Sequence, residues 1–356
     1  MNEKIDSSHI NDMLKTQIYA QFRIDNIFTF LNRFRKFFLE DTFFYRGQAN
    51  AEWDLESSYD RAKNKKGTVL YDSAYCDNRC DTFLFRGELS AIKYYMATND
   101  SFRNTRHPKI EVLSEMQHYG ASTRLLDVTE SFGVALFFAL EGNDEKNDAA
   151  IWAINKSVLL NNFFLAEFKK IPVKRRKGYH LFNPHAKMED IHLEEWVTAR
   201  FSKNETVLNE QLCVFAEELI GNKEVTTPPK HFPYSTVCPG VFPVQPMVFN
   251  NRLFAQNGLF LLQQSLEYPF LNNLLSTLNI SLSNFKKVVS SADTPNMSGK
   301  EYDSELLNTA LVKFIIPRLE FNSCKSILKS MNINYKSLFP DKYGIIKTAE
   351  KKYFPE

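Results

Sequence analysis

The sequence has almost no net charge and no long hydrophobic run. Its 356 residues include 44 Lys and Arg against 42 Asp and Glu, a formal net charge of +2. Any phosphate or nucleic-acid site would therefore have to arise from local clustering of basic residues. No apolar run approaches the roughly 20 residues that span a bilayer, and the first residues lack the apolar segment of a signal peptide. We expect a soluble, cytoplasmic protein that binds no membrane.

Cysteine is also scarce. The chain has five, an odd number, and their spacing gives no small disulfide framework. Reduced thiols are the simplest interpretation. Cys76 and Cys80 lie close together, but no second Cys or His pair follows at the spacing of a zinc site. The sequence predicts no metal site.

Hydrophobic residues, by contrast, make up 44% of the chain, and Phe alone occupies 31 positions, enough for a large aromatic core. Helical spacing of apolar residues predicts helices at 10–40, 83–98, 111–119, 125–140 and 321–331. Short β-rich or apolar runs predict strands at 42–47, 149–154 and 311–316, and a strand or a strand entering a turn at 252–261. Polar segments predict loops at 61–81 and 283–304. We expect an α+β fold whose central sheet is split or mostly antiparallel and is flanked by helices.

Four segments place polar residues and glycines in a distinctive order. They are Tyr45-Arg46-Gly47-Gln48 with Trp53, the run from Gln117-His118-Tyr119-Gly120 through Thr123-Arg124-Leu125-Leu126-Asp127, the run Arg252–Phe260, and Ile316-Pro317 with Leu338-Phe339-Pro340-Asp341 and Gly344. In this order they resemble the FRG-domain family. The chain departs from the family pattern at Ala121-Ser122, where a Pro commonly precedes the Thr, and at Val128, where Trp is common. The resemblance implies a helical extension at 1–27 and a single FRG-type domain at 28–352, with insertions near 157–235 and 283–304.

The layout is also similar to that of ADP-ribosyltransferases. In that fold an Arg at a first strand end binds a phosphate of NAD, and a Ser/Thr segment leads into a helix of Ala and aromatic residues. A late strand then carries an acidic or amide residue. Arg46, Ser122-Thr123 and Gln256 occupy these places in order.

This second resemblance implies that the protein uses NAD, either to transfer ADP-ribose or to cleave the nicotinamide bond. It also implies a role as an intracellular toxin or antiviral defence effector. The nucleotide-binding residues would be Arg46, Gly47, Gln48, Tyr119, Thr123 and Arg124. The catalytic residues would be His118, Asp127 and Gln256.

The residues themselves leave alternatives open at the start of this site. Arg46 can donate two parallel hydrogen bonds to a phosphate, and Gly47 beside it leaves the backbone open to a ligand. Arg46 could equally pair with a carboxylate such as Asp127 or Glu88. His118 could act as a general base near neutral pH, or it could simply hold its loop by hydrogen bonds.

The later site residues are open to two interpretations as well. Arg124 and Asp127 are three apart and could pair on one helical turn, or Asp127 could cap that helix. Thr123 could orient a ribose or cap a helix that begins at Arg124. Gln256 can bind a ribose hydroxyl, but it has no charge with which to stabilise a cationic transition state.

The segment Lys169–Lys177 contains six Lys or Arg among nine residues. It is either a solvated loop or a contact for a nucleic acid or protein acceptor, and a phosphate contact of this size would depend strongly on salt. The neutral side chain of Gln256 favours a second, noncatalytic function. The chain would then be a noncatalytic module that senses a nucleotide or a nucleic acid.

Overall fold

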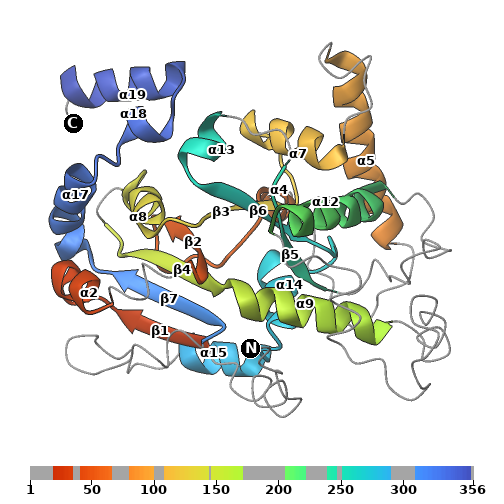
Figure 1. Ribbon diagram of the computed structural model, residues 1–356, viewed down its shortest axis with the longest axis horizontal. Helices are drawn as coiled ribbons and strands as arrows, with labels where there is room; N and C mark the ends of the chain where they lie inside the picture. Colours follow the sequence, from red (N-terminus) through yellow and green to blue (C-terminus); the bar gives the residue numbers. More distant parts are fainter. Residues whose placement is uncertain are drawn as a thin grey trace, which may run out of the picture.

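The protein is described here by a computed structural model, which covers residues 19–34, 41–65, 80–99, 108–143, 146–170, 205–221, 239–246, 251–289 and 309–353. Its centre is a 7-stranded sheet, with helices packed on both faces (Figure 1). All neighbouring strands are antiparallel except β1 and β7. The expected α+β fold is confirmed.

The strands lie in the order β1-β7-β4-β2-β3-β6-β5. Their bounds are β1 Tyr19–Arg23, β2 Phe43–Gln48, β3 Leu125–Thr129, β4 Ala149–Asn155, β5 Val241–Val244, β6 Gly258–Gln263 and β7 Leu311–Ile316.

The helices of the first half are α2 Ile27–Arg33, α4 Ser58–Lys65, α5 Cys80–Thr98, α7 Lys109–His118, α8 Phe132–Leu140 and α9 Lys156–Lys170. Those of the second half are α12 Glu205–Gly221, α13 Asn251–Ala255, α14 Phe270–Thr277, α15 Leu282–Val289, the 3-10 helix η3 Arg318–Glu320, α17 Phe321–Ser330, α18 Tyr335–Leu338 and α19 Lys342–Tyr353.

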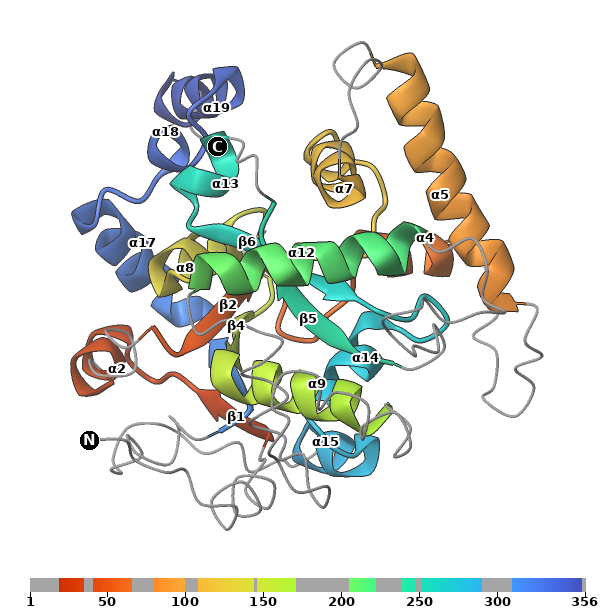
Figure 2. The ribbon, with the colours of Figure 1, turned by 45° about the vertical axis from the view of Figure 1, so that its right-hand side comes forward.

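Two separate hydrophobic clusters cover one face of the sheet. The first joins α2, α8 and α17 to β2, β4 and β7, and it includes Tyr45. The second joins α5, α7 and α12 to β5 and β6, and it includes Leu125. Both belong to the same face, because Tyr45 lies opposite Thr129 and Thr129 shares its side of β3 with Leu125. A third cluster, with α14 and α15, covers the opposite face around the buried Trp152. Figure 2 shows the same elements turned by 45° about the vertical axis.

The sheet is split between β2 and β3. β2 forms six residue pairs with β4, but it pairs with β3 only at Tyr45 and Thr129. Beyond that pair the two strands diverge, which leaves an opening on the face between the first two clusters. Of the two sheets expected, the mostly antiparallel one is confirmed, and its widened junction places Arg46 beside the opening.

Two helix predictions are wrong in part. The helix expected at 10–40 exists at Ile27–Arg33, but Tyr19–Arg23 is a strand because it pairs with β7 along its whole length. Residues 1–18 and 35–40 lie outside the described ranges. The domain boundaries at 27 and 352 stay a prediction.

The helix expected at 125–140 begins only at Phe132. Leu125–Thr129 is a strand with partners on both sides, and a short apolar run does not by itself distinguish a strand from a helix. The strand expected at 252–261 divides into α13 and β6 at a turn, where Asn257 has φ 46°. The loops expected at 61–81 and 283–304 contain the end of α4, the start of α5 and most of α15.

Candidate functional site

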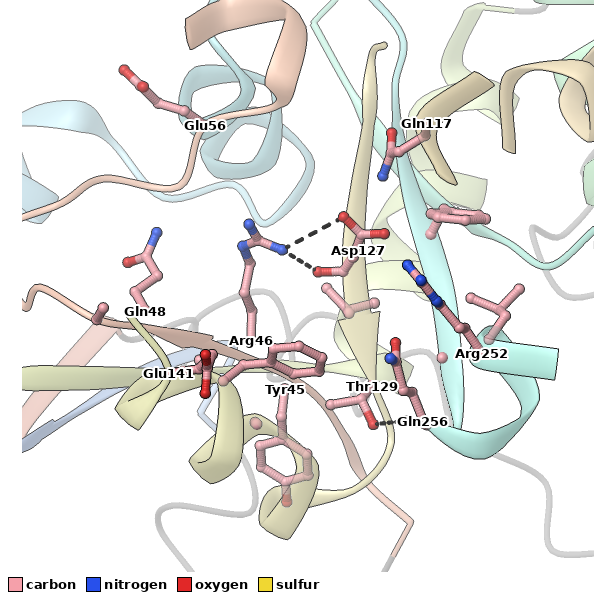
Figure 3. A pocket seen from close by; sticks show the side chains of 18 of the residues that line it. Tyr45, Arg46, Gln48, Glu56, Gln117, Asp127, Thr129, Glu141, Arg252 and Gln256 are labelled. Atoms are coloured by element: carbon pink, nitrogen blue, oxygen red, sulfur yellow. Dashed lines mark hydrogen bonds and ion pairs between the residues drawn. The ribbon is translucent and has the colours of Figure 1, made fainter. Parts of the chain in front are cut away.

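A cavity of about 830 Å³ opens at the split in the sheet (Figure 3). Its walls come from β2, β3, α7, α8, α13 and the chain that links β2 to α4. The charged, amide and imidazole side chains that line it are Arg46, Gln48, Glu52, Asp54, Glu56, Arg61, Gln117, His118, Asp127, Glu141, Arg252 and Gln256. The volume lies in the range of about 300–1,000 Å³ that is typical of small-molecule and cofactor sites.

Gly47 lets α8 pack directly against β2 at the edge of this cavity. A Cβ atom at position 47 would lie 1.9 Å from the backbone oxygen of Ala135, so no other residue fits without moving the helix. Ser131 caps the start of this helix, because its Oγ accepts a hydrogen bond from the backbone N–H of Val134 at 3.4 Å. The Phe-rich α8 thus serves as a wall of the site as well as part of the core.

Arg46 crosses the opening from β2 to β3. Its Nη1 donates to the backbone oxygen of Asp127 at 2.7 Å, and the Asp127 carboxylate is 4.0 Å away. Its Nε is buried with no hydrogen-bond partner, although 20% of the side chain is exposed. Arg46 lies inside β2, two residues before the strand ends at Gln48. Of the two carboxylates considered as its partner, Asp127 is nearby, whereas Glu88 pairs with Arg124.

Burial is the main cause that lowers the pKa of Arg46. The nearby Asp127 opposes this shift, and the positive charge of Arg61 adds to it. A guanidinium stays protonated in proteins despite such a shift. The cavity therefore contains a permanent positive charge whose hydrogen-bonding capacity is not filled, the arrangement that a phosphate or carboxylate ligand would complete.

Arg61 is a second cation of the cavity that the sequence analysis missed. It lies on α4, in a segment that polar composition predicts to be a loop. Its Nη1 donates to the backbone oxygen of Glu56 at 2.8 Å. No motif in the sequence marks this residue, because its position depends on how α4 packs.

His118 ends α7 and lines the cavity. Burial is the largest cause that lowers its pKa, and the positive charge of Arg252 acts in the same direction, while Asp341 and Glu115 oppose it. A neutral imidazole can accept a proton, which suits the expected role of a base. Tyr119, the next residue, is 73% exposed and does not line the cavity.

Arg124 and Thr123 are buried behind the site. Arg124 donates to both carboxylate oxygens of Glu88, and its Nη1 reaches the backbone oxygens of Gln263 and Gln264 at 3.3 and 3.2 Å. The expected pairing of Arg124 with Asp127 is wrong, because residues three apart on a strand point to opposite faces. Likewise, Asp127 caps no helix.

Thr123 caps no helix either. Its Oγ1 donates to the side-chain oxygen of Gln117, and its backbone oxygen accepts from Tyr59 N at 3.0 Å. Neither Thr123 nor Arg124 lines the cavity. Both therefore act on the site by fixing the elements around it, with Gln117 as the residue that reaches the cavity wall.

The side chain of Gln48 also stabilises the fold. Its Oε1 accepts from Trp152 Nε1 at 2.7 Å, and its Nε2 donates to the backbone oxygen of Asp54 at 2.9 Å. These bonds fix the chain after β2, which carries Glu52, Trp53 and Glu56 to the cavity. The main contribution of Gln48 to the site is therefore to fix the position of this loop.

Gln256 lies in the turn between α13 and β6, and not within a strand as expected. Its Nε2 donates to the backbone oxygen of Leu338 at 3.1 Å, and its backbone oxygen accepts from Thr129 Oγ1 at 2.7 Å. Gly258, which follows, is in close contact with Leu253, as its position in a tight turn requires. Gln256 therefore connects β3 to the C-terminal segment at the cavity wall.

Arg252 holds that C-terminal segment in place. Its Nε donates to Asp341 at 2.6 Å, and its guanidinium lies over the rings of Phe339 and Tyr343, 5.2 and 5.1 Å from their centroids. The hydrogen bond from Arg252 is the main cause that lowers the pKa of Asp341. Phe339 consequently forms part of the cavity wall.

Within the described ranges, no helix is both long and apolar enough to cross a membrane. No group of three or more His, Cys, Asp or Glu side chains among the same residues could hold a metal ion. The basic segment Lys169–Lys177 lies outside the described ranges apart from the last two residues of α9, and Cys76 lies outside them as well.

Residues 41–148 match the family described as the FRG domain. The match includes Arg46, Arg61, His118, Asp127 and Glu141, whereas the wall formed by Arg252–Gln256 and Phe339 lies beyond it. No curated protein and no solved structure matches the chain. The family resemblance is thus confirmed for 41–148, and the extension of the domain to 28–352 stays a prediction.

Proposed function

Because this chain carries an FRG domain, we propose that its cavity binds NAD or a related dinucleotide and that the protein transfers ADP-ribose or cleaves off nicotinamide. One observation carries the proposal. Arg46 presents its guanidinium to a cavity of ligand size, with an unfilled donor at the buried Nε. That donor would bind a phosphate oxygen of the nucleotide.

The remaining cavity groups fit the other parts of such a ligand. Gln256 uses its amide nitrogen on Leu338, so its Oε1 is the atom that would accept a bond from a ribose hydroxyl. Asp127 and Glu141 line the same cavity. Their carboxylates supply the negative charge that the neutral Gln256 lacks and that would stabilise a positively charged sugar in the transition state.

The proposed reaction breaks the bond between ribose C1′ and nicotinamide. The electron pair of this bond leaves with the nicotinamide. An oxygen of water or of an acceptor then bonds to C1′ and loses its proton. His118, which is neutral, accepts that proton. Arg46 and Gln256 hold the nucleotide in position, and Thr123 acts through Gln117.

An activity of this kind, inside the cell, would suit a toxin or an antiviral defence effector. The acceptor would be a protein or a nucleic acid, and the basic segment Lys169–Lys177 is the proposed contact for it. Binding through this segment would weaken strongly as the salt concentration rises.

The test is NAD consumption by the purified protein, with and without cell extract, followed by mass spectrometry for transferred ADP-ribose. Arg46→Ala should abolish turnover while its circular dichroism spectrum stays that of the wild type. Arg318→Ala, an exposed arginine outside the cavity, is the matched control and should keep full activity. Turnover that persists in a folded Arg46→Ala protein would contradict the proposal.

A second function is favoured by Gln256 itself. A neutral amide held by Leu338 can bind a ribose without stabilising a cation, so the same cavity would serve a noncatalytic module that senses a nucleotide or nucleic acid. The two functions differ in a simple way. The module binds NAD or ADP-ribose with a requirement for Arg46 but consumes no NAD under any condition.

A further inference from the structure

Three arginines line the cavity, and they differ in how fully their charges are neutralised. Arg252 is paired with Asp341 at 2.6 Å and stacked on two aromatic rings. Arg46 has its closest carboxylate oxygen at 4.0 Å. Arg61 has a backbone oxygen as its hydrogen-bond acceptor and forms no ion pair within the described part of the chain. The free positive charge of the cavity is therefore concentrated on Arg46 and Arg61.

Both side chains are carried by rigid elements. Arg46 belongs to β2, which is paired with β4 on both sides of it. Arg61 belongs to α4, whose start is fixed by the buried Asp60, because the Asp60 carboxylate accepts from the backbone N–H of Ser57 at 3.2 Å and of Phe270 at 2.9 Å. α4 is therefore not free to swing Arg61 away from the cavity.

The two guanidinium groups also repel each other, since the charge of Arg61 disfavours the charged form of Arg46. Two like charges held at one cavity disfavour each other, and the carboxylate of Asp127, 4.0 Å from Arg46, offsets this only in part. An anion that contacts both would remove this repulsion. Figure 3 shows Arg46 extending into the space between Glu56, just before α4, and Asp127 on β3.

We infer that Arg46 and Arg61 together form a binding site for two linked phosphates, so that the cavity selects nucleoside diphosphate compounds over nucleoside monophosphates. This inference rests on the proposed function and specifies its substrate class. One arginine binds one phosphate with two parallel hydrogen bonds, so a pair of them matches a diphosphate. The carboxylates of Glu52, Asp54, Glu56, Asp127 and Glu141 also line the cavity, and they would accept hydrogen bonds from ribose hydroxyls.

The test measures the binding of ADP-ribose and of AMP by isothermal titration calorimetry. The wild type should bind ADP-ribose more tightly than AMP. Arg61→Gln should weaken ADP-ribose binding about 10- to 100-fold, the effect of losing a charged hydrogen-bonding group, and should weaken AMP binding much less. Arg46→Gln should weaken both ligands, and Arg318→Gln should change neither.

Several outcomes would overturn the inference. If Arg61→Gln binds ADP-ribose as tightly as the wild type, Arg61 takes no part, and the proposed function survives as long as NAD turnover or binding still requires Arg46. If the wild type binds neither ADP-ribose, AMP nor NAD, both the inference and the proposed function fail. If Arg61→Gln does not fold, competition decides, because inorganic pyrophosphate should displace ADP-ribose from the wild type at a lower concentration than inorganic phosphate does. Equal displacement would overturn the inference.

Discussion

Arg46 and Asp127 are joined through the backbone of Asp127 and not through its side chain. The guanidinium donates to the carbonyl oxygen at 2.7 Å, whereas the carboxylate oxygen is 4.0 Å away and the side chain is 63% exposed. The carbonyl fixes the position of Arg46 without neutralising it. The carboxylate remains available for chemistry at the cavity.

This relationship predicts an unusual result for Asp127→Asn. The hydrogen bond to Arg46 should persist, so the fold should be unchanged, and phosphate ligands should bind up to about fivefold more tightly because a competing charge has gone. Turnover should fall if Asp127 assists catalysis. The measurement is ADP-ribose affinity beside NAD consumption, and weaker binding in a folded variant would show that the carboxylate holds Arg46 after all.

Gln256→Glu, which introduces the missing acidic residue, should not simply increase turnover. The amide nitrogen that donates to the Leu338 carbonyl at 3.1 Å would be replaced by a carboxylate oxygen that repels it. We expect a loss of about 1–3 kcal/mol in the free energy of unfolding, the cost of an unsatisfied polar group.

Urea denaturation measures this loss, and Gln256→Ala is the control, because it removes the donor without adding a repulsive charge. Gln256→Glu should be the less stable of the two at neutral pH. A Glu variant that is as stable as the wild type and consumes NAD faster would contradict this account of the C-terminal wall.

The buried pair of Arg124 and Glu88 should be among the largest contributions of single side chains to stability. Arg124 is fully buried and the Glu88 side chain is 6% exposed. Arg124→Met would leave a buried carboxylate without its partner, at a cost of about 3–5 kcal/mol. The double variant Arg124→Met, Glu88→Met should be more stable than Arg124→Met alone. Additive losses in this double-mutant cycle, followed by urea unfolding, would show that the two residues do not interact.

Lys313 should destabilise the fold at neutral pH. It is 5% exposed, lies over the ring of Trp152 at 4.5 Å, and has a pKa lowered by burial, although Asp54 and Glu52 oppose the shift. The unfolded chain therefore binds more protons than the folded chain between this lowered pKa and the ordinary value near 10.5. In that window stability should rise with pH.

Lys313→Met should consequently be more stable than the wild type at pH 7, by about 1 kcal/mol, and should lose the rise in stability toward pH 10. Thermal unfolding across this pH range measures both effects. Lys329→Met, an exposed lysine on α17, is the control. A lower melting temperature for Lys313→Met would mean that its contact with Trp152 outweighs the cost of burial.

Sequence reasoning succeeds where local signals agree with the tertiary structure. The helix that stops before Gly120 and the apolar strand at 149–154 are both confirmed, because Gly and apolar runs mark these features directly. The sequence predicts helix for Leu125–Thr129, because the apolar residues of this short segment fit both the helical repeat and the strand repeat. Only its partners β2 and β6 decide that it is a strand.

The site contains relationships that no local pattern encodes. Arg124 pairs with Glu88, 36 positions away, and not with Asp127 three positions on. Arg61 reaches the cavity because Asp60 anchors α4 to the start of α14, a contact that spans 210 residues. Gln256 meets Leu338 through a segment that folds back from the C-terminal end.

The single residue pair between β2 and β3 also has a mechanical consequence. Every other pair of neighbouring strands in the described sheet has at least four residue pairs. The junction between β2 and β3 therefore has the weakest backbone pairing, and the two strands can move relative to each other most easily here. On one face of the sheet each half has its own hydrophobic cluster, whereas the third cluster crosses the junction on the opposite face. A ligand in the cavity would contact both β2 and β3. It would therefore add contacts across this junction and make relative movement of the two strands more costly.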